Sequence, residues 1–253
     1  MPSRDDIITF CDNTLDVGAF ADYGPNGLQV PGSAEVGVIA TCVSAHLESI
    51  SRAIDAGANL LIAHHGLFWD FHSRALSEPM AARLRAALGA NLSVAGYHLP
   101  LDAHREIGNN ALLCKALGFT ASEEAFGEAK GTPIGIVGRH AEGIPASALL
   151  DAVRLKVSSK PLVFDAGPDL VRSIGIVSGA GAGMIPEAVA LGLDALLTGE
   201  PAEHAMADAR EAGLHFIAAG HYATETFGVR RLGDLVAERF GVAHEFIDVP
   251  NPV

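Results

Sequence analysis

The sequence contains little cysteine, and its cysteines form no recognisable metal-binding or disulfide pattern. Cys11, Cys42 and Cys114 are far apart in the chain and include no Cys-x-x-Cys pair. This arrangement predicts neither a thiolate zinc site nor a disulfide framework, and it is typical of proteins from a reducing compartment. We expect the three thiols to fill the hydrophobic core.

Long apolar runs and a signal peptide are also lacking. No apolar run reaches the roughly 18 residues that a membrane-spanning helix requires. Near the start, Asp5 and Asp6 stand where a signal peptide would be basic, and together with Ser3 they predict an N-capped helix. We therefore expect a cytoplasmic protein that does not bind the membrane.

Basic residues are scarce. The chain of 253 residues has 17 Lys and Arg against 30 Asp and Glu, which gives a formal net charge of −13. A surface this acidic repels phosphate backbones, so general nucleic-acid binding is disfavoured. A single nucleotide held by a metal ion remains compatible with this charge.

Motifs for common cofactors and for serine catalysis are missing as well. The glycine-rich stretch 178–184 has Met184 where a dinucleotide-binding fingerprint requires its third glycine, so a Rossmann cofactor site is disfavoured. The sequence contains no Walker A motif, and it contains no Gly-x-Ser-x-Gly elbow of a serine hydrolase. The glycine-rich stretch therefore indicates a tight turn or a phosphate cradle at the start of a helix.

What the sequence does contain is a regular alternation of apolar and alanine-rich segments. Short runs rich in Val, Ile and Leu predict strands, and the amphipathic segments between them predict helices. The predicted strands are 36–43, 59–65, 91–98, 134–140, 174–181, 195–200 and 214–222. This pattern is typical of an α/β protein with a largely parallel sheet covered by helices on both faces.

The two halves of the chain resemble each other. Residues 53–66 have the same pattern as residues 188–200, and residues 83–102 have the same pattern as residues 206–225. Each of the two later segments ends in a strand followed by a His-x-x-x-acid sequence. An internal duplication explains this similarity, although two alanine-rich α/β units can also resemble each other by chance.

We therefore expect an α/β fold of two similar three-layer α/β lobes with a metal-binding cleft between them. The polar stretch 123–133 is the candidate junction, which gives a first lobe at 1–124 and a second lobe at 125–253. The segment from about 226 to 253 ends in one more predicted strand, which we expect to return to the first lobe. Open α/β sheets bind ligands at the carboxyl ends of their strands, where the polar residues of both halves lie.

Candidate ligands in the first half follow two predicted strands. His64 and His65 stand before Gly66, which permits a turn that brings both imidazoles to one region, although adjacent histidines also occur in solvated turns. Pro100 ends the next strand and places Asp102 in a loop at the sheet edge. An acid in that position is also a common turn former or helix N-cap.

Candidate ligands in the second half follow Gly220. A helix that begins there would place His221 and Glu225 on one face, although ordinary surface pairs have the same spacing. His98 is interpreted as a hydrogen-bonded support for the ligands, with a ligand or a core histidine as the other interpretations. Glu200, at another strand end, would support the ligands or face the substrate.

Three imidazoles and two carboxylates thus follow predicted strands: His64, His65, Asp102, His221 and Glu225. Five ligands exceed the four of a tetrahedral zinc site, and none is sulfur. Two divalent ions about 3.5–4 Å apart, sharing one carboxylate, would use all five. Nitrogen and oxygen ligands suit Zn, Mn, Fe or Co and do not choose among them.

Five motifs resemble those of the Nif-three-like family, also called dinuclear metal-centre hexameric proteins or GTP cyclohydrolase type 2 homologues. They are NGLQV at 26–30, LLIAHHGLFW at 60–69, GYHLPLD at 96–102, LLTGE at 196–200 and GHYATETFGVRRL at 220–232. The resemblance implies two α/β lobes with a two-metal site between them. It also implies a toroidal homohexamer whose metal sites face an inner cavity.

The resemblance further implies a role for each ligand. His64 and His221 would bind one ion, His65 and Asp102 would bind the other, and Glu225 would bridge both. Many family members have proline where this chain has Gly66, a difference that leaves the ligands intact.

The residues therefore predict a metal-dependent hydrolase of a nucleotide or similar small molecule, and the resemblance suggests GTP cyclohydrolase activity. In that reaction a metal-activated water would attack C8 of guanine, the imidazole ring would open and formate would leave. His98 and Glu200 are the candidates for proton transfer. The alternative is a non-enzymatic metal-binding hexameric ring that acts as a metallochaperone or a regulatory scaffold, because the same ligands would serve it.

Overall fold

Residue contacts divide the chain into two compact units in the computed structural model, which describes residues 1–253. The first unit comprises Met1–Leu101 and Gly228–Val249, and the second comprises Asp102–Phe227 and Pro250–Val253. The sequence analysis placed the junction after residue 124, whereas this division falls after Leu101. The reason is strand pairing, because Thr120–Ala121 (β5) pairs with Ile136–Pro145 (β8) in the second sheet.

The first unit contains a five-stranded sheet in the order β1-β4-β3-β2-β13. Its strands are Gly27–Val30 (β1), Val38–Ser44 (β2), Leu60–His65 (β3), Ser93–Gly96 (β4) and Ala243–Phe246 (β13). Strands β4, β3, β2 and β13 are parallel, and only β1 is antiparallel to its neighbour. A strand from the C-terminal part of the chain thus completes this sheet.

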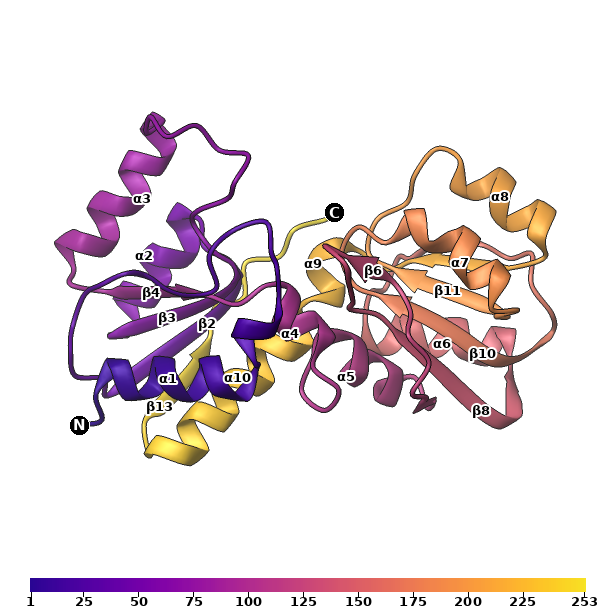
Figure 1. The fold of residues 1–253 in the computed structure, drawn as a ribbon, viewed down its shortest axis with the longest axis horizontal. Helices are drawn as coiled ribbons and strands as arrows, with labels where there is room; N and C mark the ends of the chain where they lie inside the picture. Colours follow the sequence, from indigo (N-terminus) through magenta and orange to yellow (C-terminus); the bar gives the residue numbers. More distant parts are fainter. The chain divides into compact units, whose positions relative to one another are not determined.

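Helices cover both faces of the first sheet (Figure 1). Leu47–Asp55 (α2) and Glu78–Gly89 (α3) lie on one face and share a hydrophobic core with the strands. Arg4–Thr14 (α1) and Thr226–Phe240 (α10) lie on the other face, where the rings of Phe10 and Phe240 meet edge to face with centroids 5.5 Å apart. Because helices cover both faces of the sheet, side chains on both sides of each strand are buried, and the strands are continuous apolar runs in the sequence.

The N-terminal helix begins as the sequence predicts. The Ser3 side chain accepts hydrogen bonds from the backbone N–H groups of Asp5 and Asp6. Both acids lie in the first turn, where the helix dipole favours negative charge. A short 3-10 turn, Val17–Ala19 (η1), follows before β1.

The second unit contains a six-stranded sheet in the order β5-β8-β10-β11-β12-β9. Its other strands are Leu162–Phe164 (β9), Leu170–Val177 (β10), Ala195–Thr198 (β11) and His215–Ala218 (β12). Outside this sheet, Glu128–Ala129 (β6) forms a separate hairpin with Thr132–Pro133 (β7). Only β10, β11 and β12 run parallel to one another as neighbours. The prediction of a largely parallel sheet is therefore wrong for this unit, because the apolar pattern of a strand does not encode its direction.

Helices cover both faces of the second sheet as well (Figure 1). Asn109–Ala116 (α5) and Ala146–Lys156 (α6) pack into one hydrophobic core with the strands. Ile185–Ala190 (α7) and Ala205–Ala212 (α8) lie on the opposite face. The α/β class predicted from the sequence is thus confirmed.

The same run of elements occurs once in each unit. The run β2-α2-β3-α3-β4 of the first unit corresponds to β10-α7-β11-α8-β12 of the second, and the three strands of each run are parallel. The similar segments of the sequence fall on these runs. Parallel strands joined by helices bring their carboxyl ends to one edge of a sheet, and the candidate ligands of each half follow those ends.

The three cysteines are buried, and none forms a disulfide. Burial raises the pKa of Cys11 and Cys42 to about 12 and that of Cys114 to about 11. These thiols are therefore protonated at neutral pH and contribute to the core as apolar groups.

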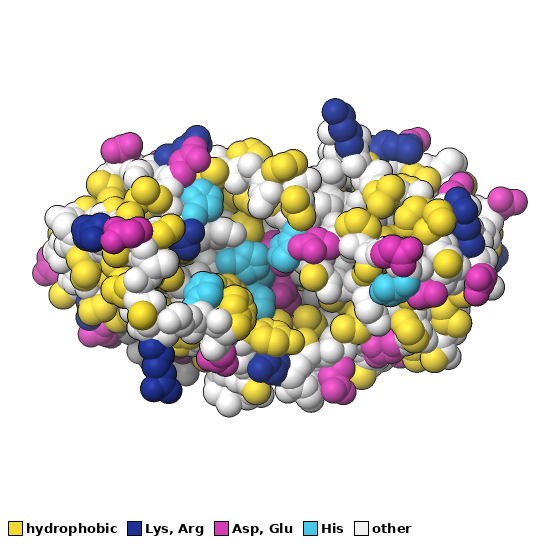
Figure 2. All heavy atoms as spheres, turned by 90° about the horizontal axis from the view of Figure 1, so that it is seen from above, with side chains coloured by type: hydrophobic (Ala, Val, Ile, Leu, Met, Phe, Trp, Pro, Cys, Tyr) yellow, Lys and Arg dark blue, Asp and Glu magenta, His cyan; other side chains and the backbone are white.

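No helix combines the length and the apolar character needed to cross a membrane. On the face drawn in Figure 2, basic side chains are scattered among acidic and apolar ones and form no continuous patch.

Helix α10 depends on one glycine for its approach to the first sheet. A Cβ at Gly233 would collide with the imidazole of His244 and would lie 2.7 Å from Cγ2 of Thr41. The imidazole is held in place, because its Nε2 lies 2.8 Å from Oγ1 of Thr41 and its Nδ1 lies 2.9 Å from Oδ1 of Asp234.

We expect Gly233→Ala to lower the free energy of unfolding by about 1–3 kcal/mol, because overpacking outweighs the higher helix propensity of alanine. Gly89→Ala is the matched control, since Gly89 is also helical and a Cβ there meets no atom within 4 Å. Urea denaturation measures both variants. Equal stability of the two would show that α10 is not held in this way.

Candidate metal centre

Three histidines of the first unit form a cluster at adjacent strand ends. His64 and His65 are the last residues of β3, and His98 follows β4. The candidate ligand atoms of the three imidazoles lie within 4.8 Å of one another. Their ring centroids are 4.7 Å, 5.2 Å and 5.6 Å apart. The doublet is thus part of a histidine cluster and not of an isolated solvated turn.

Hydrogen bonds at Nδ1 fix the two rings of the doublet. Nδ1 of His64 lies 2.9 Å from the backbone carbonyl oxygen of Tyr97. Nδ1 of His65 lies 3.0 Å from Oγ of Ser44. A partner at Nδ1 makes Nε2 the nitrogen that can coordinate a metal, which is the usual arrangement of metal-binding histidines.

The ring of His98 is fixed by an acid that the sequence analysis did not single out. Nδ1 of His98 lies 2.7 Å from Oδ1 of Asp22, and the backbone N–H of His98 donates to Oδ1 of Asn26. Burial alone would raise the pKa of Asp22, but its hydrogen bonds with His98 and Asn26 outweigh burial and hold the pKa below its usual range. Asp22 is therefore ionised at neutral pH and orients His98.

Asp102 lies in a short helix, Leu99–Ala103 (α4), and not in the loop that the sequence predicts. Pro100 ends the strand but also fits the first turn of a helix, where a missing N–H costs no hydrogen bond. Asp102 is buried, and its Oδ1 accepts hydrogen bonds from Nδ2 of Asn109 at 2.8 Å and from Oγ of Ser178 at 2.9 Å. These donors fix the orientation of the carboxylate.

His221 and Glu225 lie together in the second unit. His221 begins a one-turn helix, His221–Thr224 (α9), after Gly220 has made the turn with a φ of 94° that favours glycine. Nε2 of His221 lies 3.0 Å from Oε1 of Glu225, so the two side chains do share one face. Nδ1 of His221 contacts Oε1 of Glu200, and Glu200 is therefore the support of this ring.

The two carboxylates determine the charge of His221. Burial lowers the pKa of this imidazole, but hydrogen bonds and negative charges from Glu225 and Glu200 outweigh burial and raise the pKa to about 9. The imidazole is therefore protonated at neutral pH when no metal ion is bound. A divalent cation can take the place of that proton, because it satisfies the same carboxylates.

The glycine-rich stretch 178–184 forms a tight turn, one of the two structures that its sequence indicates. The backbone N–H of Gly179 donates to Oγ1 of Thr224, and that of Gly181 donates to Oγ1 of Thr198. Two of the backbone donors that a phosphate cradle would use are therefore already engaged.

Gly179 also leaves the space that the carboxylate of Glu225 occupies. A Cβ at this position would lie 2.5 Å from Oε1 of Glu225 and 3.1 Å from Nε2 of His221, and the φ of Gly179 is 64°. Only glycine combines this backbone conformation with so close an approach.

Sequence reasoning missed the residues that orient the candidate ligands: Asp22, Ser44, Tyr97, Asn109 and Ser178. Of these residues, only Ser178 could have been singled out from the sequence, because it is the first residue of the glycine-rich stretch at the end of a predicted strand. The others have no fixed spacing from the residues they support. Asp22, for example, lies 76 residues before His98.

The donors of both units suit a divalent metal ion. The first unit supplies imidazole nitrogens, and the second supplies an imidazole and carboxylate oxygens, which are the ligands of Zn, Mn, Fe and Co in proteins. Each imidazole has a partner at Nδ1, as metal ligands usually do. The structure thus contains His, Asp and Glu groups that could hold a metal.

Comparison with curated proteins finds relatives along the whole chain. A protein of Deinococcus radiodurans named GTP cyclohydrolase 1 type 2 homolog is 38% identical over 248 residues, which cover 98% of this chain and 94% of that protein. A protein of the same name from Escherichia coli K12 is 39% identical over 239 residues, which cover 94% of each chain.

Comparison with solved structures finds the same fold. Protein ybgI, described as being of unknown function, has a TM-score of 0.93 and 37% identity, with both chains covered completely. TTHA1606 from Thermus thermophilus has a TM-score of 0.88 and 31% identity, also over both whole chains. Reduced HcgD from Methanocaldococcus jannaschii has a TM-score of 0.85 and 20% identity over 98% of both chains, and it shows the fold alone.

The motifs of the sequence and the relatives agree on one family. Residues 2–252 match the model described as Duf34/NIF3 (NGG1p interacting factor 3). The chain therefore belongs to the Duf34/NIF3 family.

Proposed function

We propose that this protein is a metal-dependent hydrolase of a nucleotide or similar small molecule, with GTP as the candidate substrate. Two divalent ions would be held by His64, His65, Asp102, His221 and Glu225. The name GTP cyclohydrolase 1 type 2 homolog, borne by curated relatives that are 38–39% identical, supports GTP as the first substrate to test. The metal can be Zn, Mn, Fe or Co. The homohexamer remains a prediction.

The orientation of the imidazoles is the observation that carries this proposal. A backbone carbonyl, a hydroxyl and a carboxylate fix Nδ1 of His64, His65 and His221 respectively. Histidines that only fill a core or cap a surface do not need this common arrangement, whereas metal ligands do. The carboxylates of Asp102 and Glu225 are both buried, as suits ligands of a cation.

Bound metal ions would supply a water molecule whose pKa is lowered toward neutrality. In the cyclohydrolase reaction, water adds at C8 of guanine, the bond from C8 to a ring nitrogen breaks, and a second water releases C8 as formate. The leaving nitrogen needs a proton, and His98 is the candidate to give one from Nε2, because its Nδ1 is held by Asp22. Glu200 can accept a proton through its contact with His221.

We expect Glu225→Gln to reduce the metal content of the purified protein by about half or more, because a neutral amide is a weak ligand for a divalent ion. Glu211→Gln is the control, since Glu211 is an exposed carboxylate on α8 of the same unit. Elemental analysis of protein purified without chelator or affinity tag measures both. Full metal content in Glu225→Gln would remove this residue from the ligands.

Metal binding should also release a proton from His221. Its pKa of about 9 means that the imidazole carries a proton at pH 7, and coordination requires the neutral ring. The affinity for the metal should therefore rise with pH up to about 9 and level off above it. Calorimetry in buffers of different ionisation enthalpy counts the protons.

Glu200→Gln provides the control for this proton count. Glu200 is one of the two carboxylates that raise the pKa of His221, so its removal should lower that pKa and decrease the proton release at pH 7. Binding that releases no proton in the unmodified protein would contradict the role of His221.

The hydrolase proposal itself is tested by formate release. Metal-loaded protein incubated with GTP should release formate, and His65→Ala should lower the rate by about a hundred-fold or more, since loss of a residue that only supports a ligand already costs about ten- to a hundred-fold. A panel of other nucleotides under the same conditions tests for a different base. Protein with full metal content that converts none of these nucleotides would instead favour the non-enzymatic role as a metallochaperone or scaffold.

A further inference from the structure

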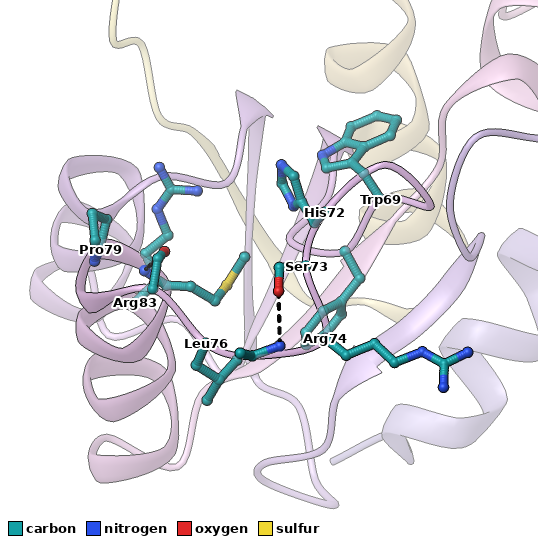
Figure 3. Close-up of a pocket in the computed structure, with 11 residues that line it drawn as sticks. Trp69, His72, Ser73, Arg74, Leu76, Pro79 and Arg83 are labelled. Carbon is teal, nitrogen blue, oxygen red and sulfur yellow. Dashed lines mark hydrogen bonds between the residues drawn. The ribbon is translucent and has the colours of Figure 1, made fainter.

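A cavity of about 510 Å³ lies in the first unit between the loop that follows β3 and helix α3. We call it the α3 pocket, and it is lined by Phe68–Trp69, residues 72–77, Pro79, Met80 and Arg83. Figure 3 shows Arg83 on the helix side, with Trp69, His72 and Ser73 on the loop side. Its volume is within the range of small-molecule sites, which is about 300–1,000 Å³.

The charge of the α3 pocket is unusual for this chain. No acidic residue lines it, although the protein has 30 Asp and Glu and a net charge of −13. Arg83 has no carboxylate partner, whereas Arg85 on the same helix pairs with Glu78 at 3.9 Å. Arg83 is half-buried and lines the pocket, and the donors of a guanidinium match the oxygens of a phosphate.

The remaining walls of the pocket add hydroxyl and apolar groups. Ser73 and Ser77 lie on the rim, and Ser77 caps α3 by accepting a hydrogen bond from the backbone N–H of Met80. Leu76 and the buried Met80 supply apolar contacts. In Figure 3 the guanidinium of Arg74 extends away from Arg83, so Arg83 is the main cation of the pocket.

Trp69 lies between the α3 pocket and the histidine cluster and contacts both. Its ring lines the pocket, and its centroid lies 5.9 Å from that of His65 and 5.1 Å from that of His98. The ring of Phe71 stacks on that of Trp69, with the ring planes at 16° and the centroids 5.8 Å apart. A ligand in the pocket would therefore have an aromatic surface between its charged end and the imidazoles.

We propose that the α3 pocket binds the phosphate end of a nucleoside phosphate through Arg83, and that Trp69 directs the nucleoside toward the histidine cluster. The substrate class of the proposed hydrolase would then be phosphorylated nucleosides, with free nucleosides bound poorly. The direction of the nucleoside rests on the proposed function. Phosphate binding by Arg83 rests only on the pocket and holds even if the protein hydrolyses nothing.

Trp69 makes this proposal directly measurable, because it is the only tryptophan in the chain. Its fluorescence reports on the α3 pocket without a label. The protein is first freed of metal with a chelator and dialysed, so that phosphates cannot act by removing metal ions. It is then titrated with inorganic pyrophosphate, with guanosine monophosphate and with guanosine.

Pyrophosphate and guanosine monophosphate should each give a saturable change in fluorescence, and guanosine should bind about ten-fold or more weakly than its monophosphate. Arg83→Gln should weaken both phosphate ligands by about ten-fold or more and leave guanosine unchanged, since only the charge-assisted bonds are lost. Arg85→Gln is the matched control and should bind all three ligands as the unmodified protein does.

Two results would overturn the proposal. One is the absence of a saturable response to either phosphate ligand in the unmodified protein. The other is an equal affinity of Arg83→Gln and Arg85→Gln for guanosine monophosphate. Because these titrations contain no metal and need no turnover, they separate failure of the pocket from failure of the hydrolase proposal. Phosphate binding without formate release would leave the pocket intact and remove only the proposed reaction.

Discussion

The hydrogen bond at Nδ1 of each candidate histidine is the constraint on which the rest of the site depends. An imidazole has two nitrogens, and a partner at one of them determines how the other is directed. In this chain the partners are the carbonyl of Tyr97, the hydroxyl of Ser44, and the carboxylates of Asp22 and Glu200. Ser44 ends β2, Tyr97 directly follows β4, and Glu200 stands two residues after β11. The sheets therefore fix the geometry of the donors before any ion arrives.

Charge acts differently at the candidate metal centre and at the α3 pocket. The carboxylates of Glu225 and Glu200 favour the protonated imidazole of His221 or a cation in place of its proton. No carboxylate lines the α3 pocket, so the guanidinium of Arg83 offers its charge to an anion there. We propose that a strongly acidic chain can in this way bind both a metal ion and a phosphate group, each through different side chains.

Much of this could be predicted from the sequence. Periodicity indicated the strands, and glycine or proline after a strand indicated where His64, His65, His221 and Glu225 would stand. The similar segments of the two halves fell on equivalent runs of elements. Local chemistry was sufficient here, because a buried strand must be apolar and its end must be polar.

The rest depends on contacts that are distant in the chain. Asp22 and His98 are 76 residues apart in the chain, and so are Asp102 and Ser178. No sequence motif predicts either hydrogen bond. Strand direction was not predictable for β8 and β9, and pairing of β5 with β8 moved the boundary between the units to Leu101. The helix at Asp102 was missed because Pro100 fits both the end of a strand and the first turn of a helix.

Gly179 has a consequence for the energetics of the second unit. Its carbonyl oxygen accepts hydrogen bonds from the backbone N–H groups of Gly199 and Glu200, and its own N–H donates to Thr224. One residue thus links the end of β10 to the residues after β11 and to α9. A cation held by His221 and Glu225 would consequently be coupled to the cooperative opening of this whole sheet edge, and loading would protect its amides from exchange well beyond the ligands themselves.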